Sequence, residues 1–465
     1  MLKVGASDVG SRSGDEDRAG DIPGLLRLLF ASLVTGLAIG VVGSAFRGLL
    51  SFSNKARDAL IAEAHASRWQ GFVAVALTVA IAAMIARWLV VRFAPMAAGS
   101  GVQHVEAVMR NEAFPAGAAV IPVKFVAGLL AIGSGLVLGR EGPTVQMGAT
   151  IGTILSERVM RRDPDQTVVH AAGAGAGLAV AFNAPIGGAV FVFEELTRSF
   201  TARQVLATLC AAGAAVAVMR SALGDLMEFH AGTPVDQPLF QLLYHFVMGA
   251  GLGLVGAAYS ALTIALLKAG DSFHRIPSVL RAGFVGIVVG TLGWFGPSLI
   301  GGGESVASAI LASSPAAAGL AVLFVARFFV GPFSYAAGTP GGVFAPLLAM
   351  GATFGALFAQ LANVLQPAWN LSPTVFAVVG MAAMFTAVVR APLTGAVLAI
   401  EMTGRADCAL AMLVASMAAA AFATAVGSEP IYDTLRKRML AADRSKVQST
   451  LAGPAPDADN RPSQR

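Results

Sequence analysis

The stretch Gly139-Arg140-Glu141-Gly142-Pro143 places two charged side chains between long apolar runs, in a chain where only 13% of the 465 residues are charged. Ionisable groups at membrane depth are costly, and they usually face a pathway or a partner rather than lipid. Proline fits the first turn of a helix, where the free amide groups and the helix dipole attract anions. The stretch therefore predicts a helix that begins inside a membrane and holds an anion at its amide end, with Glu141 itself as the first candidate.

A second copy of this stretch occurs later in the chain. Gly342 to Gly355 matches Gly139 to Gly152 at the first glycine, the proline, the run Met-Gly-Ala-Thr and the last glycine. At nearly the same offset, Ala391 to Glu401 matches Ala184 to Glu194. Two matches of this kind indicate that the halves of the chain are structural repeats. Repeats whose apolar segments are interrupted by glycine and proline at corresponding positions point to the central site of a transporter.

The composition places most of the chain in lipid. Hydrophobic residues make up 56% of the sequence, and the mean hydropathy is +0.71, which excludes a single soluble core. The net charge is +5, but the basic residues lie in short loops and at the ends, as in a membrane protein, so no nucleic-acid partner is expected. The two cysteines and the scattered histidines support neither a disulfide framework nor a metal site. We expect no metal and no cofactor.

The apolar segments divide the chain into two membrane repeats with a polar tail at each end. We predict a flexible tail over residues 1–22, a first membrane repeat over 23–222, a second over 223–440 and a disordered tail over 441–465. Many apolar pieces are shorter than the roughly 20 residues that a straight crossing needs. Such pieces must be half-helices or steeply tilted helices whose ends are shielded by protein. The predicted fold class is an all-α polytopic membrane protein.

Four ordered elements resemble the CLC family of chloride channels and proton-coupled chloride antiporters. They are Gly99-Ser100-Gly101, the stretch Gly139 to Pro143, the stretch Gly341 to Pro346, and Tyr432, in the family's order and at its spacing. The resemblance spans about residues 24 to 440, which is essentially the whole membrane portion. The chain is similar to bacterial members that lack the paired regulatory CBS domains.

The resemblance implies an inverted repeat of two antiparallel halves, built from many tilted and broken helices. It also implies a homodimer with a separate pore in each subunit, in the cell inner membrane and with both termini in the cytoplasm. The basic run Arg436 to Arg438 agrees with that orientation, because cytoplasmic segments carry an excess of Lys and Arg. The substrates implied are chloride and protons, and the partners are the lipid bilayer and a second copy of the chain.

The resemblance also implies which residues bind the anion. Ser100 resembles the family serine whose hydroxyl meets the central anion, and Tyr432 resembles the tyrosine that contacts it from the other side. Val343 and Phe344 match the positions whose backbone amides donate to the same ion. These donors suit chloride, because a site with a full fixed positive charge would bind the ion too tightly for it to leave.

Two glutamates are implied to handle protons. Glu141 resembles the gating glutamate, whose carboxylate competes with chloride and swings away when protonated. Glu195 resembles the internal glutamate that relays protons from the cytoplasmic side in antiporters. Its neighbour Glu194 points about 100° away on a helix, so the two cannot face one path. Glu194 matches Glu401 in the repeat, and we expect it to be structural.

A supporting set of motif residues accompanies these positions, and the sequence departs from the family's pattern at two places. Gln103 stands where many relatives have proline, and Ala336 to Pro340 replaces the commoner Gly-Ser-Gly-Ala-Pro. Fluoride is a less expected substrate, because fluoride-selective relatives usually lack the serine and tyrosine pattern found here. The supporting residues are Gly99, Gly101, Gly139, Arg140, Gly142, Pro143, Gly341, Gly342 and Pro346.

Simpler interpretations exist for each of these features. Arg140 and Glu141 would be a helix start that snorkels to an interface. Ser100 would be a helix cap, and Tyr432 an interfacial aromatic. The second copy of the Gly139 to Pro143 stretch and the order of the four family elements weigh against these interpretations. Glu106, Lys124 and Glu401 are better explained as a buried, structural charge network at subunit or helix contacts.

The predicted function is an antiporter that exchanges chloride for protons, because coupling needs a proton path through Glu195 as well as an anion path. A passive voltage- or pH-gated chloride channel of the same family is the alternative. From another class, an intramembrane hydrolase would use Ser100 or His104. That alternative is weak, since no acid, base and nucleophile are visible at a plausible spacing. We expect a transporter rather than an enzyme.

Overall fold

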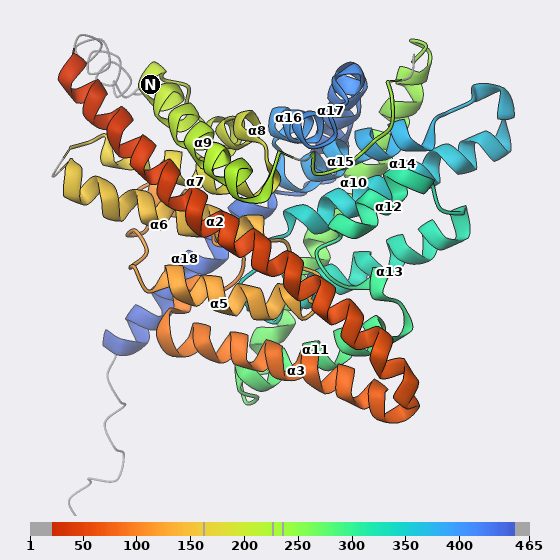
Figure 1. Ribbon diagram of the computed structural model, residues 1–465, viewed down its shortest axis with the longest axis horizontal. Coiled ribbons are helices and arrows are strands. Elements are labelled where there is room, and N and C mark those ends of the chain that lie inside the picture. Colours follow the sequence, from red (N-terminus) through yellow and green to blue (C-terminus); the bar gives the residue numbers. More distant parts are fainter. Residues whose placement is uncertain (1–20, 161–162, 226, 235–236, 452–465) are drawn as a thin grey trace, which may run out of the picture.

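The computed structural model describes residues 21–160, 163–225, 227–234 and 237–451. Within these ranges every named element is a helix, which confirms the predicted all-α fold class (Figure 1). Almost all of the predicted N-terminal tail and the last part of the predicted C-terminal tail lie outside the described residues.

The helices follow one another in two series that meet at the loop over residues 224–240. Those of the first half are α2 (Ile22–Ala64), α3 (Arg68–Phe93), α4 (Val102–Met109), α5 (Val120–Gly133), α6 (Glu141–Val159), α7 (Gln166–Phe182), α8 (Pro185–Phe191), the π-helical η3 (Val192–Leu196) and α9 (Ala202–Leu223). Those of the second half are α10 (Gln241–Ser272), α11 (Ser278–Phe295), α12 (Glu304–Ser313), α13 (Ala317–Tyr335), α14 (Phe344–Leu365), α15 (Pro373–Val389), α16 (Pro392–Thr403), α17 (Ala409–Ala425) and α18 (Ile431–Leu451).

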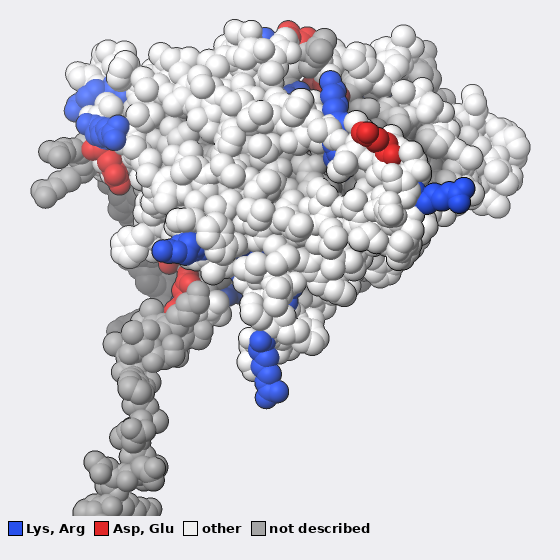
Figure 2. All heavy atoms as spheres, turned by 60° about the horizontal axis from the view of Figure 1, so that its bottom comes forward, with Lys and Arg blue, Asp and Glu red and all other residues white. Residues whose placement is uncertain are grey.

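Seven of the described helical stretches are long and apolar enough to cross a membrane. They are Ile22–Phe93, Ala202–Leu223, Gln241–Ser272, Ser278–Phe295, Ala317–Tyr335, Phe344–Leu365 and Ala406–Ala425. Other apolar helices, among them α5, α7, α15 and α16, are shorter than the roughly 20 residues of a straight crossing, as predicted. Phe30, Ile81 and Phe284 are exposed on long helices, and the face in Figure 2 carries few charged groups. Such a surface suits lipid.

Two matching helix pairs form the centre of the molecule. Helix α6 packs against α7, and α14 packs against α15, and α6 and α14 contain the two copies of the repeated stretch. A Cβ atom on Gly148 would overlap the carbonyl oxygen of Gly173, and one on Gly351 would overlap that of Gly380. Small residues therefore bring both pairs close together in the same way. This equivalence supports the interpretation of the halves as repeats.

The two halves interlock rather than lie apart. Helix α2 crosses the front of the first half in Figure 1 and packs against α6, α7 and α9. Helix α11 of the second half packs against α3, and α18 returns to contact α4. In Figure 1 the blue α18 lies among the orange and yellow helices. Residues from the start and the end of the chain therefore meet in one site.

Two predicted elements differ from the structure. The tail predicted to be disordered from residue 441 continues as helix α18 to Leu451. Its sequence from Ala441 is rich in good helix formers, so a polar segment continues the helix instead of unwinding. The apolar run over residues 185–196 predicts one short helix, but the structure has α8 followed by the π-helix η3 there. The wider π turn holds Glu194 and Glu195, and such turns are frequent at functional sites.

Replacement of Gly148 by alanine should destabilise the protein by about 1–3 kcal/mol, because the new methyl group would overlap the backbone of α7. Gly213→Ala is the matched control, since a Cβ atom on Gly213 meets no heavy atom within 4 Å. The control should be neutral or slightly stabilising, as alanine favours helix over glycine by up to about 1 kcal/mol. Thermal unfolding of the two variants in the same detergent measures the difference. Equal midpoints would contradict the close packing of α6 on α7.

Candidate ion-transport site

The four elements of the resemblance meet at one place between the halves. Gly139 and Gly342 exchange two backbone hydrogen bonds of 2.8 and 2.7 Å. The amide of Gly341 donates to the carbonyl of Gly99 at 3.2 Å. The ring of Tyr432 packs on that of Phe344 with centroids 5.7 Å apart. The site is therefore formed by three glycine-rich turns and the start of α18.

Glu141 lies at the centre of this arrangement and is 1% exposed. Its Oε1 atom accepts hydrogen bonds from the amide of Phe344 at 2.7 Å and from the amide of Ala345 at 3.3 Å. The sequence predicted Glu141 at the amide end of its own helix, and this is wrong: the carboxylate lies at the amide end of α14, which contains the second copy of the stretch. Cβ atoms on Gly139 or Gly342 would clash with this carboxylate, so both positions need glycine. The two copies of the stretch thus form one anion cradle.

The predicted amide donors are placed at the same cradle. Phe344 is one of the two donors to Glu141, and Ala345 is the other. Val343 directly precedes them and is 2% exposed. The resemblance assigns Val343 and Phe344 to the anion, and these contacts stay predictions.

Ser100 and Tyr432 bring two buried hydroxyl groups to the site, and both residues are 0% exposed. The two hydroxyls face each other, and neither has a further hydrogen-bond partner among the described residues. Leaving a buried polar group unpaired costs about 1–3 kcal/mol, so both hydroxyls are suited to donate to a ligand. A Cβ atom on Gly142 would meet the Ser100 hydroxyl at 2.5 Å, which places Ser100 directly against the start of α6. This geometry disfavours the capping role for Ser100 and the interfacial role for Tyr432.

The surroundings of the Ser100 hydroxyl also weigh against a hydrolase. A serine nucleophile is activated by a hydrogen-bonded base, which is in turn held by a third group. Apart from the Tyr432 hydroxyl that faces Ser100, neither the Ser100 hydroxyl nor the Nε2 atom of His104 has a hydrogen-bond partner within the described residues. The contact that would define this alternative is therefore missing from the described part of the chain.

Glu195 and Glu194 differ sharply in their surroundings. Glu195 is 2% exposed, and its Oε1 atom has no partner among the described residues. The carboxylate of Glu194 accepts from the amides of Leu393 and Thr394 at 3.1 and 2.7 Å, at the start of α16. Glu401 accepts in turn from the amides at the start of α8. The two repeats therefore exchange helix caps through Glu194 and Glu401, while Glu195 stays available.

The other predicted structural charges are buried, but they have separate partners. Lys124 is 0% exposed and donates to the side-chain oxygen of Gln146. Glu106 is also 0% exposed and binds Arg110 at 2.6 Å. The buried charges expected from the sequence are present, although Lys124 and Glu106 are not one network.

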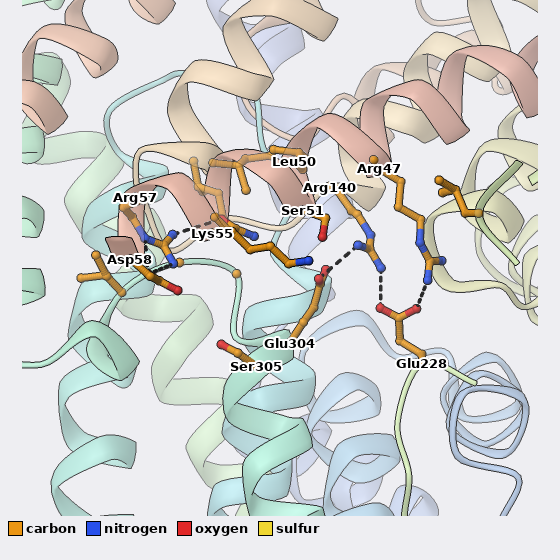
Figure 3. A pocket seen from close by; sticks show the side chains of 18 of the residues that line it. Arg47, Leu50, Ser51, Lys55, Arg57, Asp58, Arg140, Glu228, Glu304 and Ser305 are labelled. Atoms are coloured by element: carbon orange, nitrogen blue, oxygen red, sulfur yellow. Dashed lines mark hydrogen bonds and ion pairs between the residues drawn. The ribbon is translucent and has the colours of Figure 1, made fainter. Parts of the chain in front are cut away.

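A polar cavity of about 680 Å³ reaches Arg140 from the other side of Glu141. Figure 3 shows the carboxylate of Glu228 between Arg47 and Arg140, with Glu304 on the second edge of Arg140. The contacts of Arg140 measure 2.6 Å to Glu228 and 3.1 Å to Glu304, and Arg47 lies 2.5 Å from Glu228. The guanidinium of Arg140 is thus fixed by two carboxylates. We call this space the Arg140 cavity.

Sequence reasoning missed the acidic partners of Arg140. The polar sequence between the repeats, which contains Glu228, predicts an exposed connection, yet the side chain of Glu228 is only 8% exposed. Glu304 directly follows the glycine run Gly301 to Gly303. That run was a visible break in the pattern and could have marked Glu304 as a site residue. No sequence signal indicates that Glu228 folds back onto Arg140.

The charge of Glu228 is stabilised by its neighbours. Burial alone would raise the pKa of the Glu228 carboxyl, but the positive charges of Arg140 and Arg47 and their hydrogen bonds hold the pKa below its ordinary value. The carboxyl therefore stays ionised at neutral pH and ties the loop over 224–240 to α2 and α6.

Replacement of Glu228 by glutamine should destabilise the protein by about 2 kcal/mol at neutral pH, because two guanidinium groups lose a charged acceptor. A depressed pKa stabilises the fold above the unfolded value of about 4.3, and this stabilisation is lost as the pH falls through the folded value. The difference between the two proteins should therefore shrink below about pH 4. Asp225→Asn, which breaks the exposed pair with Arg220 in the same loop, is the control and should change little. Unfolding midpoints across pH test this, and an unchanged difference at low pH would contradict it.

Comparison with known proteins agrees with this geometry. Residues 82–424 match the family described as voltage gated chloride channel. The H(+)/Cl(-) exchange transporter ClcA of Vibrio cholerae serotype O1 is 38% identical over 433 residues, which cover 90% of this chain and 91% of the relative. The same transporter of Klebsiella pneumoniae is 34% identical over 441 residues, which cover 93% of this chain and 92% of the relative.

Solved structures extend the similarity to the fold. A slow cyanobacterial Cl-/H+ antiporter is 31% identical, with a TM-score of 0.85 over 89% of this chain and 98% of that one. A eukaryotic CLC transporter, 21% identical, shares the fold with a TM-score of 0.75 over 89% of this chain and 74% of that one. The matched family region contains Ser100, Glu141 and Glu195. With the repeated glycine-rich turns meeting at one buried carboxylate, the chain belongs to the voltage-gated chloride channel family.

Proposed function

We propose that this protein exchanges chloride for protons across the membrane, in opposite directions. The observation that carries the proposal is the carboxylate of Glu141 at the amide end of α14, beside the buried hydroxyl of Tyr432. A carboxylate held there occupies a place suited to an anion and is itself a proton acceptor. The similar transporters of Vibrio cholerae and Klebsiella pneumoniae, and the similar cyanobacterial antiporter, are named for the same exchange.

Chloride binds between the hydroxyls of Ser100 and Tyr432 and the backbone amides of Val343 and Phe344. These donors carry no full positive charge, so the ion is held and can still leave. The amides at the start of α14 are now taken by Glu141. Protonation removes the negative charge that these amides favour, and the side chain then yields its place to chloride. Glu141 is the gate.

Glu195 relays protons between the cytoplasm and the gate. The side chain is buried on the π-helix η3, and one of its oxygens makes no hydrogen bond among the described residues. A buried carboxylate without a fixed partner is suited to take up and release a proton. Since the charged Glu141 carboxylate and chloride compete for the same cradle, protonation of Glu141 favours anion binding there, and the two ions become thermodynamically linked.

The Arg140 cavity is the entrance from the outer side. With the N-terminus in the cytoplasm, α2 begins on the inner side, and its later residues Arg47, Lys55 and Arg57, which line the cavity, lie toward the outside. Arg140 joins the cavity to the gate, because Glu141 follows it directly. Arginine and lysine side chains and the carboxylates that pair with them line the cavity. This polar lining lets small anions reach the gate from water.

The protein acts as a homodimer in the cell inner membrane, with both termini in the cytoplasm. The basic residues Arg436 to Arg438 on α18 favour this orientation. Exposed apolar residues such as Ile186 on α8, Leu393 on α16 and Met417 on α17 offer a surface for a second copy. The two helix caps exchanged through Glu194 and Glu401 lie at the starts of α8 and α16.

Purified protein in liposomes, with a chloride gradient and no proton gradient, tests the exchange. Uphill proton movement, followed as external pH while chloride runs down its gradient, is the expected result. Chloride movement without any proton movement would identify the passive channel instead. If no anion moves under any gradient, the proposed function is wrong. Empty liposomes and liposomes with protonophore added are the controls.

A further inference from the structure

A cluster of five charged side chains joins three segments that carry proposed transport residues. Its members are Glu106 and Arg110 of α4 and its end, Arg198 after η3, and Asp433 and Arg436 of α18. We call it the α4–α18 ion cluster. None of its members lines the Arg140 cavity, and none has a role in the exchange described above.

Asp433 is the member that contacts all three segments. Its Oδ2 atom lies 3.0 Å from Arg198. Its Oδ1 atom lies 3.0 Å from Arg436 and 3.4 Å from Arg110. The side chain is only 15% exposed, so these contacts are better shielded from water than surface ion pairs, which contribute little.

Glu106 is a second, fully buried carboxylate that lies near the same three arginines. It is 0% exposed, and its carboxylate lies 2.6 Å from Arg110, 3.5 Å from Arg436 and 3.8 Å from Arg198. Removing the Asp433 charge takes away the closest carboxylate of Arg198, at 3.0 Å, and leaves Arg198 only the longer contact of 3.8 Å with Glu106. The cluster therefore holds its three segments in one fixed arrangement.

Each segment leads directly to a proposed transport residue. Asp433 follows Tyr432, and Arg198 lies three positions after Glu195. Helix α4, whose C-cap is Arg110, begins two residues after Ser100. The carboxylate of Asp433 thus links side chains of the three segments that contain Ser100, Tyr432 and Glu195.

One further observation bears on the segment after η3. Arg198 has a φ of 50°, in the left-handed region that a side chain such as arginine rarely adopts. A conformation of this kind persists where surrounding contacts hold it, and the contact of Arg198 with Asp433 is one of them.

We propose that Asp433 is a positioning residue that keeps chloride and proton movement coupled. By fixing Tyr432 against the segment of Glu195, it keeps the inner side of the anion site closed while Glu141 is displaced by chloride. Loss of the Asp433 charge lets this side loosen, so that chloride passes without a proton. The inference rests on the proposed roles of Tyr432 and Glu195.

The test compares the number of chloride ions moved per proton in liposomes that contain the full chain. For Asp433→Asn we expect this ratio to rise by about fivefold or more, the lower end of typical coupling between two sites. Asp433→Glu restores the charge and should bring the ratio back toward that of the unmodified protein. The matched control is Asp271→Asn. It breaks the exposed ion pair between Asp271 of α10 and Arg438, which lies on α18 like Asp433, and it should leave the ratio unchanged.

A purely structural role would lower the protein yield, or the transport rates of chloride and protons together, and leave their ratio unchanged. A folded Asp433→Asn protein with the normal ratio would therefore overturn the proposal. An equal rise in Asp271→Asn would also overturn it, because the effect would then belong to any loosening of α18. If Asp433→Asn does not fold, Arg198→Lys decides, since lysine keeps the positive charge but loses the forked guanidinium contact. Its ratio should rise, and an unchanged ratio would reject the inference.

The Glu195→Gln variant separates this inference from the proposed function. If Glu195→Gln uncouples the ions and Asp433→Asn does not, only the positioning role of Asp433 is wrong. If Glu195→Gln leaves the ratio unchanged, the proposed proton role of Glu195 is wrong, whatever Asp433→Asn does.

Discussion

Replacement of Glu141 by glutamine is expected to abolish uphill proton movement while chloride transport continues. Glutamine fills the same space but carries no charge and cannot take up a proton in this range. The amides of Phe344 and Ala345 are then free of a competing anion. Proton movement should fall by at least about 100-fold, as on removal of a positioned proton-transfer group. The liposome assay with a chloride gradient measures both ions in one experiment.

The dependence of chloride transport on pH provides the sharper measurement for this variant. In the unmodified protein, chloride can enter the cradle only as the Glu141 carboxylate loses its charge, so flux should rise as the pH falls. In Glu141→Gln the flux should no longer follow pH in this way. Glu401→Gln, which weakens a carboxylate cap at the start of α8, is a control and should keep the pH dependence. Retained proton coupling in Glu141→Gln would contradict the gating role.

Replacement of Glu195 by glutamine is expected to remove proton coupling without removing the anion path. Glu195 is buried and has an unpaired oxygen, but none of the predicted chloride donors belongs to its segment. Proton movement should again fall by at least about 100-fold, while chloride still runs down its gradient. Unlike Glu141→Gln, this variant should keep the rise of chloride flux at low pH, because the gate remains titratable.

The neighbouring residue offers the matched control for Glu195. Glu194 lies in the same π turn and caps α16 through the amides of Leu393 and Thr394. Glu194→Gln should lower stability by about 1 kcal/mol, since glutamine keeps an acceptor oxygen but loses the charge. Proton coupling should persist. If Glu194→Gln uncouples the ions and Glu195→Gln does not, the assignment of the two glutamates is reversed.

The comparison of the two variants also separates antiporter from channel. A passive channel has no use for a proton at Glu195, so Glu195→Gln would leave such a protein unchanged. The π-helical turn that contains Glu194 and Glu195 is a local distortion that directly follows the α-helix α8. Distortions of this kind are frequent at functional sites, which favours the exchange.

The sequence alone determined the fold class and the repeated design. These properties can be read from local features: the apolar runs, the short interrupted segments and the two copies of the Gly139 to Pro143 stretch. Local features are sufficient because a membrane helix makes its backbone hydrogen bonds within its own segment. The same local chemistry indicated that a carboxylate would meet a helix amide end. Order and spacing of four elements were enough to predict that Ser100, Glu141 and Tyr432 belong together.

Only the tertiary structure decided which partners meet. Glu141 binds α14 rather than its own helix, Glu228 folds back from the loop to Arg140, and Asp433 joins α4 to the segment after η3. These contacts link residues far apart in the chain, and no periodicity or motif encodes them. The sequence shows which charged residues lie in apolar segments. The folding of the two halves onto each other decides which opposite charge or backbone amide stabilises each of them.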